Sequence, residues 1–132
     1  MSNLPIFEPG AKLLLFYRFV FYGTLVLGCV LAFAPANQTL HANVNDKVLH
    51  GIGFFVLAFW SHLAHPRARG FIPVIGLSVF GILIELVQAA LPYRSFSWLD
   101  WLADVFGVLA YYLLLAPLMV RFAARPGISE PN

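Results

Sequence analysis

Long apolar stretches separated by short polar connectors dominate the hydrophobicity pattern of this chain. The four stretches cover residues 13–34, 48–64, 71–91 and 98–120. Each is close to the ~20 residues that cross the ~30 Å hydrocarbon core of a bilayer as a helix. Helices are the open-ended structures that satisfy their own backbone hydrogen bonds in lipid. The pattern therefore predicts an all-α fold, an integral membrane bundle of four transmembrane helices, forming one domain over residues 1–132.

Proline residues refine the expected ends of these helices. Pro73 falls in the first turn of the third stretch, where its missing N–H does no harm, and Pro92 closes that stretch. Pro117 lies near the end of the fourth stretch and predicts a kink or an end there. The tail at residues 125–132 contains Pro, Gly and Ser and is predicted to be disordered.

Composition supports the membrane interpretation and excludes several other classes of protein. The chain is 61% hydrophobic and 11% charged, against roughly 45–50% and 25% in soluble domains. The net charge of +2 is small, and no basic stripe is present for nucleic acid. Cys29 is the single cysteine, which leaves no CxxC motif, and no pair of histidines has zinc or haem spacing. The sequence therefore indicates no nucleic-acid partner, no metal site and no identifiable cofactor.

The basic residues near the ends of the stretches predict the orientation. With the N-terminus inside, the outer side carries only Lys47 and Arg94. The inner side then carries Lys12, Arg18, Arg67, Arg69, Arg121 and Arg125. Because basic residues favour the cytoplasmic side, we expect a multi-pass protein of the inner (plasma) membrane with cytoplasmic N- and C-termini.

Two acids inside apolar stretches are the strongest functional signal. Glu85 lies in the third stretch and Asp104 in the fourth, and a carboxylate at a bilayer centre costs at least ~2.5 kcal/mol. Glu85 shares a helical face with small and polar residues, as does Asp104. At 1.5 Å rise per residue both acids are expected at about the same depth, facing each other inside the bundle.

Further polar residues are expected at the same, outer end. They are His50, which with Glu85 and Asp104 is a catalytic candidate, and the binding candidates Asp46, Lys47, Gln88, Arg94 and Asp100. Simpler explanations exist for some of them. Asp46 and Asp100 are also suited to capping helix N-termini, and Glu85 with Arg94 can form a structural ion pair. His62 and His65 are expected at the opposite end, facing headgroups.

These residues in order resemble the pattern of the VanZ-like membrane protein family. The matching fragments are Asp46-Lys47-x-x-His50, Glu85-x-x-Gln88, Arg94 and Asp100-x-x-x-Asp104-x-x-Gly107. Two departures concern Asp104, where many relatives carry Asn, and the region of Tyr111, where they carry Gly. The family is named for a protein linked to resistance to the glycopeptide teicoplanin, so the resemblance implies a cell-envelope setting rather than a defined reaction.

The sequence favours an outward-facing pocket that binds or modifies a lipid headgroup or a lipid-linked cell-wall intermediate. In a binding protein, Arg94 would hold an anionic headgroup. In an enzyme, Glu85 or Asp104 would act as general acid or base, with His50 as a second proton-transfer group or a metal ligand. A structural subunit of a membrane complex and a proton-coupled transporter are the alternatives. Whether a reaction occurs, and in what oligomeric state, stays open at this point.

Overall fold

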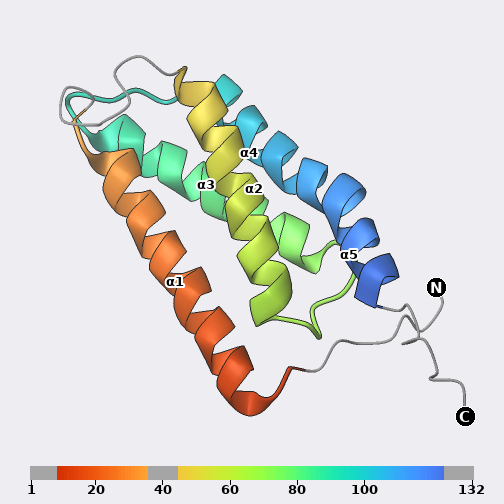
Figure 1. Ribbon diagram of the computed structural model, residues 1–132. Coiled ribbons are helices and arrows are strands. Elements are labelled where there is room, and N and C mark those ends of the chain that lie inside the picture. Colours follow the sequence, from red (N-terminus) through yellow and green to blue (C-terminus); the bar gives the residue numbers. More distant parts are fainter. Residues whose placement is uncertain (1–8, 36–44, 124–132) are drawn as a thin grey trace, which may run out of the picture.

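The computed structural model describes residues 9–35 and 45–123, and within them every regular element is a helix. The elements are α1 (Ala11–Phe33), α2 (Asp46–Ala64), α3 (Ile72–Ala90), α4 (Trp98–Ala110), the π-helical segment η2 (Tyr111–Leu115) and α5 (Ala116–Ala123). The last three run on as one helix of 26 residues (Figure 1). The predicted all-α fold is confirmed, with helix bounds close to those expected. The predicted disordered tail lies outside the described residues.

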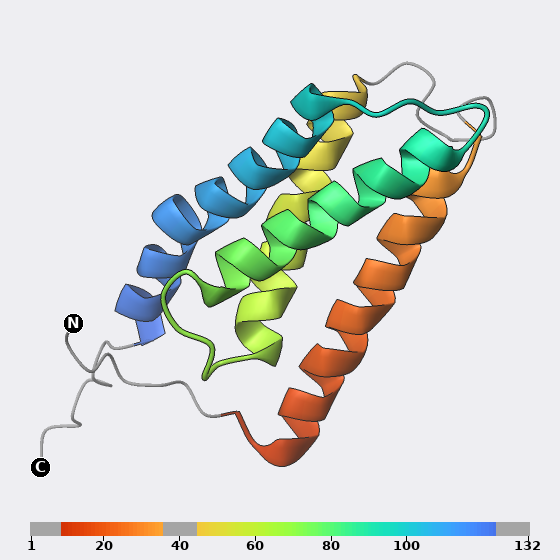
Figure 2. The ribbon, with the colours of Figure 1, turned by 180° about the vertical axis from the view of Figure 1, so that it is seen from behind.

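The four long helices alternate in direction, so the molecule has two distinct ends. In Figures 1 and 2, α1 and α3 end where α2 and α4 begin. We call this the polar end, because it holds Asp46, Lys47, His50, Glu85, Arg94, Asp100 and Asp104. The opposite end holds the start of α1, the α2–α3 connector and the end of α5. Helix α2 lies centrally and packs against α1, α3 and α4.

Small residues let α2 and α4 approach closely. A Cβ atom placed at Gly107 would collide with the carbonyl oxygen of Gly51, and one placed at Gly51 would lie 3.5 Å from the carbonyl oxygen of Ala103. Ala103 and Gly107 form the small-xxx-small pair that their spacing predicts to allow close helix contact. The α2–α4 contact is also the most extensive between any two elements among the described residues. It is this approach that brings the polar residues of the two helices together.

The fourth helix does not end at Pro117. Of the two expected outcomes, a kink or an end, the end is therefore not found. The chain instead widens into the π-helical segment η2 just before it and continues as α5. Proline in a helix interior lacks an N–H and clashes with the carbonyl of the preceding turn. A π-helical turn changes the hydrogen-bond spacing, which accommodates the ring without ending the helix.

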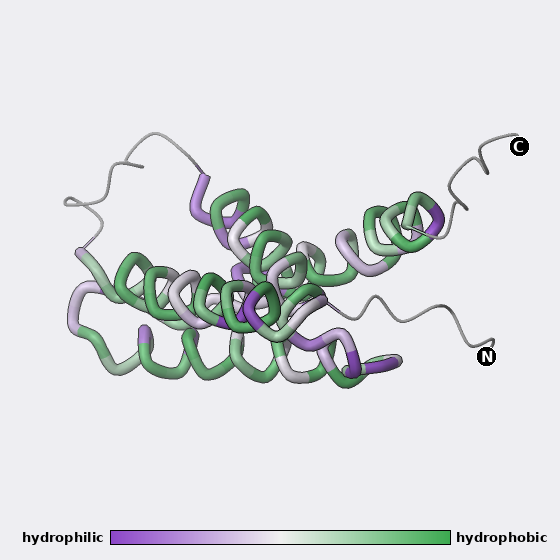
Figure 3. The backbone as a smooth tube through the Cα atoms, turned by 60° about the horizontal axis from the view of Figure 1, so that its bottom comes forward, coloured by the Kyte–Doolittle hydropathy of each residue, from purple (hydrophilic) through white to green (hydrophobic). Residues whose placement is uncertain are grey.

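Apolar side chains cover much of the outer surface. Phe19 is 78% exposed, Phe106 73% and Leu113 70%, and hydrophobic residues colour most of the length of the helices in Figure 3. Each of α1, α2, α3 and the α4–η2–α5 helix is long and apolar enough to cross a membrane. In α1 the single buried residue is Phe21. Such a surface is suited to a lipid bilayer and poorly suited to water.

Candidate functional site

A hydrogen bond between His50 and Asp104 lies at the centre of the polar end. His50 Nδ1 is 2.8 Å from Asp104 Oδ1, and Asp104 is fully buried. The two residues come from α2 and α4, which their close approach at Gly107 brings into reach. The other oxygen of Asp104 would lie 2.8 Å from a Cβ at Gly81, so this glycine makes room for the carboxyl group. Asp104 is thus held between α2 and α3.

Glu85 is the second fully buried acid. Its Oε2 accepts a hydrogen bond of 2.8 Å from the backbone N–H of Ser97, while Oε1 is buried without a hydrogen-bond partner among the described residues. Ser97 caps α4, its side-chain oxygen accepting from the N–H of Asp100. Gly81, one turn before Glu85 on α3, lies against the carboxyl group of Asp104. Glu85 and Asp104 are therefore both buried at the polar end, as expected, and that they face each other stays a prediction.

Two ion pairs lie above this buried layer, nearer the surface. Lys47 Nζ is 3.2 Å from Asp100 Oδ1, and Arg94 Nη1 is 3.6 Å from Asp46 Oδ2. The side chain of Asp46 is half exposed, whereas that of Asp100 is 11% exposed. Arg94 therefore pairs with Asp46, and the alternative expectation of a structural Glu85–Arg94 pair is not what the polar end presents.

Helix capping accounts for only part of these positions. Asn45, rather than Asp46, caps α2 through a hydrogen bond from the N–H of Lys47, and Ser97 rather than Asp100 caps α4. Asp46 and Asp100 instead occupy the first turns of their helices, where a negative charge is favourable. Neither acid is the capping residue of its helix, and each carboxylate contacts a basic side chain of the polar end.

Gln88 and Arg94 attach the end of α1 to the polar end. Gln88 Nε2 donates to the carbonyl oxygen of Ala32 at 2.8 Å, and Arg94 Nη2 donates to that of Ala34 at 3.0 Å. The last carbonyls of a helix have no intrahelical partner, so these contacts satisfy them. Gln88 was a binding candidate from sequence, and the structure shows that its amide already serves this packing role.

The opposite end contains a second histidine contact that sequence reasoning missed. His62 Nδ1 lies 2.7 Å from the hydroxyl oxygen of Tyr111, and Tyr111 is fully buried. The expectation that His62 faces headgroups is therefore wrong, because its ring lies between α2 and η2. Residue spacing alone gives little signal for this pair, since it depends on how α2 and the fourth helix are aligned.

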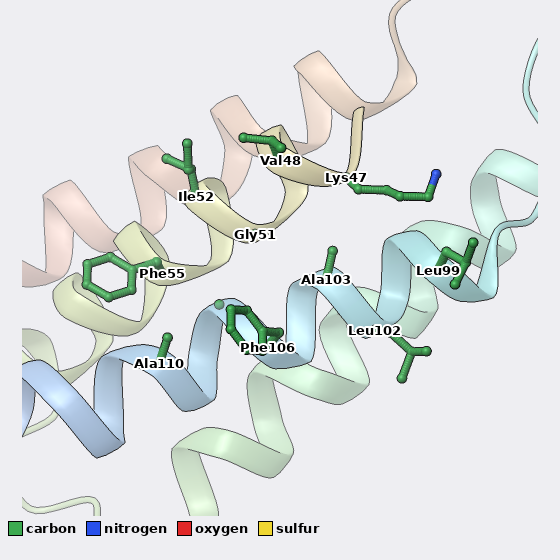
Figure 4. Close-up of a pocket in the computed structure, with 11 residues that line it drawn as sticks. Lys47, Val48, Gly51, Ile52, Phe55, Leu99, Leu102, Ala103, Phe106 and Ala110 are labelled. Atoms are coloured by element: carbon green, nitrogen blue, oxygen red, sulfur yellow. The ribbon is translucent and has the colours of Figure 1, made fainter. Parts of the chain in front are cut away.

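An apolar groove runs along the outside of the α2–α4 pair, with a volume of about 660 Å³. Figure 4 shows its lining, with Lys47 at the end nearest the start of α4. The groove is lined by Lys47, Val48, Gly51, Ile52, Phe55, Leu99, Leu102, Ala103, Phe106, Gly107 and Ala110. Gly51 and Gly107 belong to its lining, so residues that allow the close helix contact also border the groove. Residue spacing carries no signal for this groove, because its walls come from two helices.

Three side chains of the polar end are arranged as metal ligands would be. One ligand atom each from Asp46, His50 and Asp100 lies within 4.8 Å of the other two. Asp46 and His50 are one turn apart on α2, whereas Asp100 comes from α4. Only the fold brings them together, which is why spacing along the sequence indicated no metal site.

The chain is similar to an uncharacterized protein of Schizosaccharomyces pombe, with 35% identity over 92 residues. The match covers 67% of this chain and 55% of the yeast protein, so the chain spans about half the length of that relative. No protein-family model matches the chain. No solved structure matches it either.

Proposed function

We propose that this chain is a VanZ-like, multi-pass membrane protein of the cell envelope that binds a lipid with a phosphate-bearing headgroup. The headgroup sits at the polar end, and one acyl chain lies in the α2–α4 groove. A lipid-linked cell-wall intermediate is one member of this ligand class. The resemblance in sequence runs through Asp46, His50, Glu85, Arg94 and Asp104, and these residues lie at one end of the fold.

The membrane location is supported by length, composition and surface. All four long helices satisfy the requirements for crossing a bilayer, and the large exposed side chains on their outer faces are apolar. Lys12, Arg18, Arg67, Arg69 and Arg121 all lie toward the opposite end. The positive-inside tendency therefore directs the opposite end to the cytoplasm and the polar end outward, in the plasma membrane, with cytoplasmic termini.

The observation that carries the proposal is the position of Lys47 at the end of the groove. Its side chain is 44% exposed and contacts Asp100, which leaves ammonium protons for another acceptor. The rest of the groove lining is apolar. An apolar groove with one cation at the headgroup level matches a lipid, in which an apolar acyl chain is joined to a charged phosphate. A soluble ligand would gain nothing from the apolar part.

Lipid binding is tested with the full chain purified in detergent and titrated with defined phospholipids, with native mass spectrometry as the readout. Lys47→Gln should weaken binding of phosphate-bearing lipids several-fold, because a charge-assisted contact is lost. Ala110→Phe should fill the groove and weaken binding as well. The matched controls are Lys12→Gln at the opposite end and Leu86→Phe on the exposed face of α3.

Comparable binding by Lys47→Gln, Ala110→Phe and both controls would show that the groove is not a specific site. Anionic and zwitterionic phospholipids, compared in the same titration, identify the headgroup class. A neutral diacylglycerol that binds as tightly as either would exclude the phosphate contact.

Chemical modification of the bound headgroup is a second candidate function, and two buried oxygens favour it. Glu85 Oε1 and Asp104 Oδ2 have no hydrogen-bond partner among the described residues, and paired acids are suited to general acid–base work. The test is lipid mass spectrometry of cells that carry the wild type or Glu85→Gln. A reaction is supported by a lipid species whose amount differs between cells with and without the wild-type gene, but is the same in cells with Glu85→Gln as in cells without the gene. Identical lipid profiles in all these cells exclude a reaction.

A further inference from the structure

The polar end contains more negative than positive charge. Four carboxylates, those of Asp46, Glu85, Asp100 and Asp104, gather around two basic groups, Lys47 and Arg94. With His50 neutral and the acids ionised, two negative charges are uncompensated. Uncompensated charge in a poorly solvated site is costly. Either two protons or one divalent cation would balance it.

The ion pairs leave the two outer carboxylates incompletely satisfied. Charge-assisted N–H···O bonds are typically about 2.7–2.9 Å long, whereas the contacts from Lys47 to Asp100 and from Arg94 to Asp46 measure 3.2 and 3.6 Å. Asp100 as a residue is only 7% exposed, and the contact from Lys47 Nζ to its Oδ1 does not have hydrogen-bond geometry. A buried acceptor of this kind, beside a histidine, is available to a stronger partner.

We propose that Asp46, His50 and Asp100 form a divalent metal-ion site that Asp104 orients. Bonds of about 2.0–2.2 Å place neighbouring donor atoms of one tetrahedral ion about 3.4 Å apart, and the three donors here lie within 4.8 Å of one another. Closure of the half-exposed Asp46 side chain, with adjustment of its neighbours, would complete the set. One imidazole and two carboxylates suit Zn²⁺ or Mn²⁺ and leave coordination positions for water or a phosphate oxygen.

The His50–Asp104 hydrogen bond has the form expected beside a metal. A histidine that binds a metal through one nitrogen generally donates its other N–H to a carboxylate, which fixes the ring. Asp104 Oδ1 lies 2.8 Å from His50 Nδ1; in the proposed site Nδ1–H donates to it and Nε2 keeps its lone pair for the ion. Asp104 is fully buried and therefore holds the ring firmly. The arrangement, with acid and histidine one turn apart on α2, resembles metal sites built between bundle helices.

The test is calorimetric titration of the full chain in detergent with Zn²⁺, and separately with Mn²⁺, in the absence of added lipid. We expect one ion per chain. Asp46→Asn should weaken binding at least tenfold while leaving the fold unchanged, since this side chain is half exposed. His50→Gln and Asp100→Asn should do the same, and Asp104→Asn should weaken binding tenfold to a hundredfold. The matched control is His65→Gln at the opposite end.

Cobalt substitution gives a second measurement, because the visible absorption of Co²⁺ reports its ligands. The spectrum should change in His50→Gln and stay unchanged in His65→Gln. Absence of saturable Zn²⁺ and Mn²⁺ binding by the folded wild type would overturn the proposal. So would wild-type affinity for both ions in Asp46→Asn and His50→Gln.

Lys47→Gln separates this inference from the lipid-binding proposal, on which it does not depend. Removing the ammonium beside Asp100 should strengthen Zn²⁺ binding several-fold, because a competing cation is gone, whereas lipid binding should weaken. Lipid binding that is normal in EDTA, with no metal bound by any variant, would refute the metal site and leave the lipid proposal standing. Zinc binding without any lipid binding would refute the lipid proposal and leave the metal site standing.

Discussion

The two ends of the bundle each contain a histidine of α2 that contacts the fourth helix, yet the surroundings differ. At the polar end His50 meets Asp104 at 2.8 Å, among further carboxylates and two basic side chains. At the opposite end His62 meets Tyr111 at 2.7 Å, among the rings of Phe59 and Tyr112. The same kind of contact therefore lies among ionisable side chains at one end and among aromatic rings at the other.

The two ends differ in the buried polar atoms near each histidine that have no hydrogen-bond partner. Tyr111 Oη lies near His62 and, at 3.5 Å, near the sulfur of Met119, and in the described part of the chain the unpartnered buried group beside this contact is the neutral hydroxyl of Tyr112. Asp104 and Glu85 retain buried oxygens without hydrogen-bond partners among the described residues. Unsatisfied buried groups are expensive to keep, and they persist where a ligand or a reaction uses them. This comparison places the candidate function at the polar end.

The largest effect is expected at the contact between α2 and α4, because both histidine contacts join α2 to the fourth helix. Gly107→Ala would drive a Cβ into the Gly51 carbonyl, separating α2 from α4 and lowering the free energy of unfolding by on the order of 3 kcal/mol. Thermal denaturation in detergent measures this loss. Gly53→Ala is the matched control, because nothing lies within 4 Å of a Cβ there. Equal melting temperatures for the two variants would contradict the close approach.

Asp104→Asn is expected to damage only the polar end. The amide keeps the size of the side chain but removes the charge that orients His50, so Zn²⁺ binding should weaken at least tenfold. Circular dichroism should show unchanged helix content. If binding is unaffected, the buried charge of Asp104 plays no part in the site.

Tyr111→Phe is the corresponding change at the opposite end. It removes the hydroxyl that His62 contacts and should lower the free energy of unfolding by about 1 kcal/mol, without altering lipid binding. Denaturation and lipid titration of the same preparation give both values. Weaker lipid binding in this variant would mean that the two ends are coupled.

Gly81→Ala probes the room around Asp104 and should act more weakly. The added Cβ would lie 2.8 Å from Asp104 Oδ2, so the carboxyl group must shift. Zn²⁺ binding at the polar end should therefore fall a few-fold. Gly76→Ala, also on α3 and with nothing within 4 Å of its Cβ, should bind as the wild type. A full loss of binding in both variants would point to α3 itself rather than to Asp104.

Leu83→Ile gives the smallest expected effect. Leu83 is 53% exposed on α3, so the change should alter the free energy of unfolding by less than about 0.5 kcal/mol and leave both ends intact. Denaturation and lipid titration should match the wild type. A loss comparable to that of Asp104→Asn would show that apolar and polar faces of the helices are equally critical.

The sequence by itself determined the helices and the identity of the principal polar residues. Apolar runs of about 20 residues allow few structures other than spanning helices, and a shared helical face predicted that Glu85 and Asp104 point inward. Both inferences rest on local periodicity, which the chain carries without its fold. The helix bounds and the burial of these two acids agree with them.

Only the tertiary structure decided which side chains meet. The partners of Arg94, the use of Gln88 to hold α1, the His62–Tyr111 contact and the α2–α4 groove all depend on the alignment of different helices. Between α2 and α4, the close approach of Gly51 and Gly107 is one contact that limits this alignment, and it joins residues distant in sequence. Periodicity fixes the face on which a residue lies, whereas packing between helices fixes the depth and the partner that it meets.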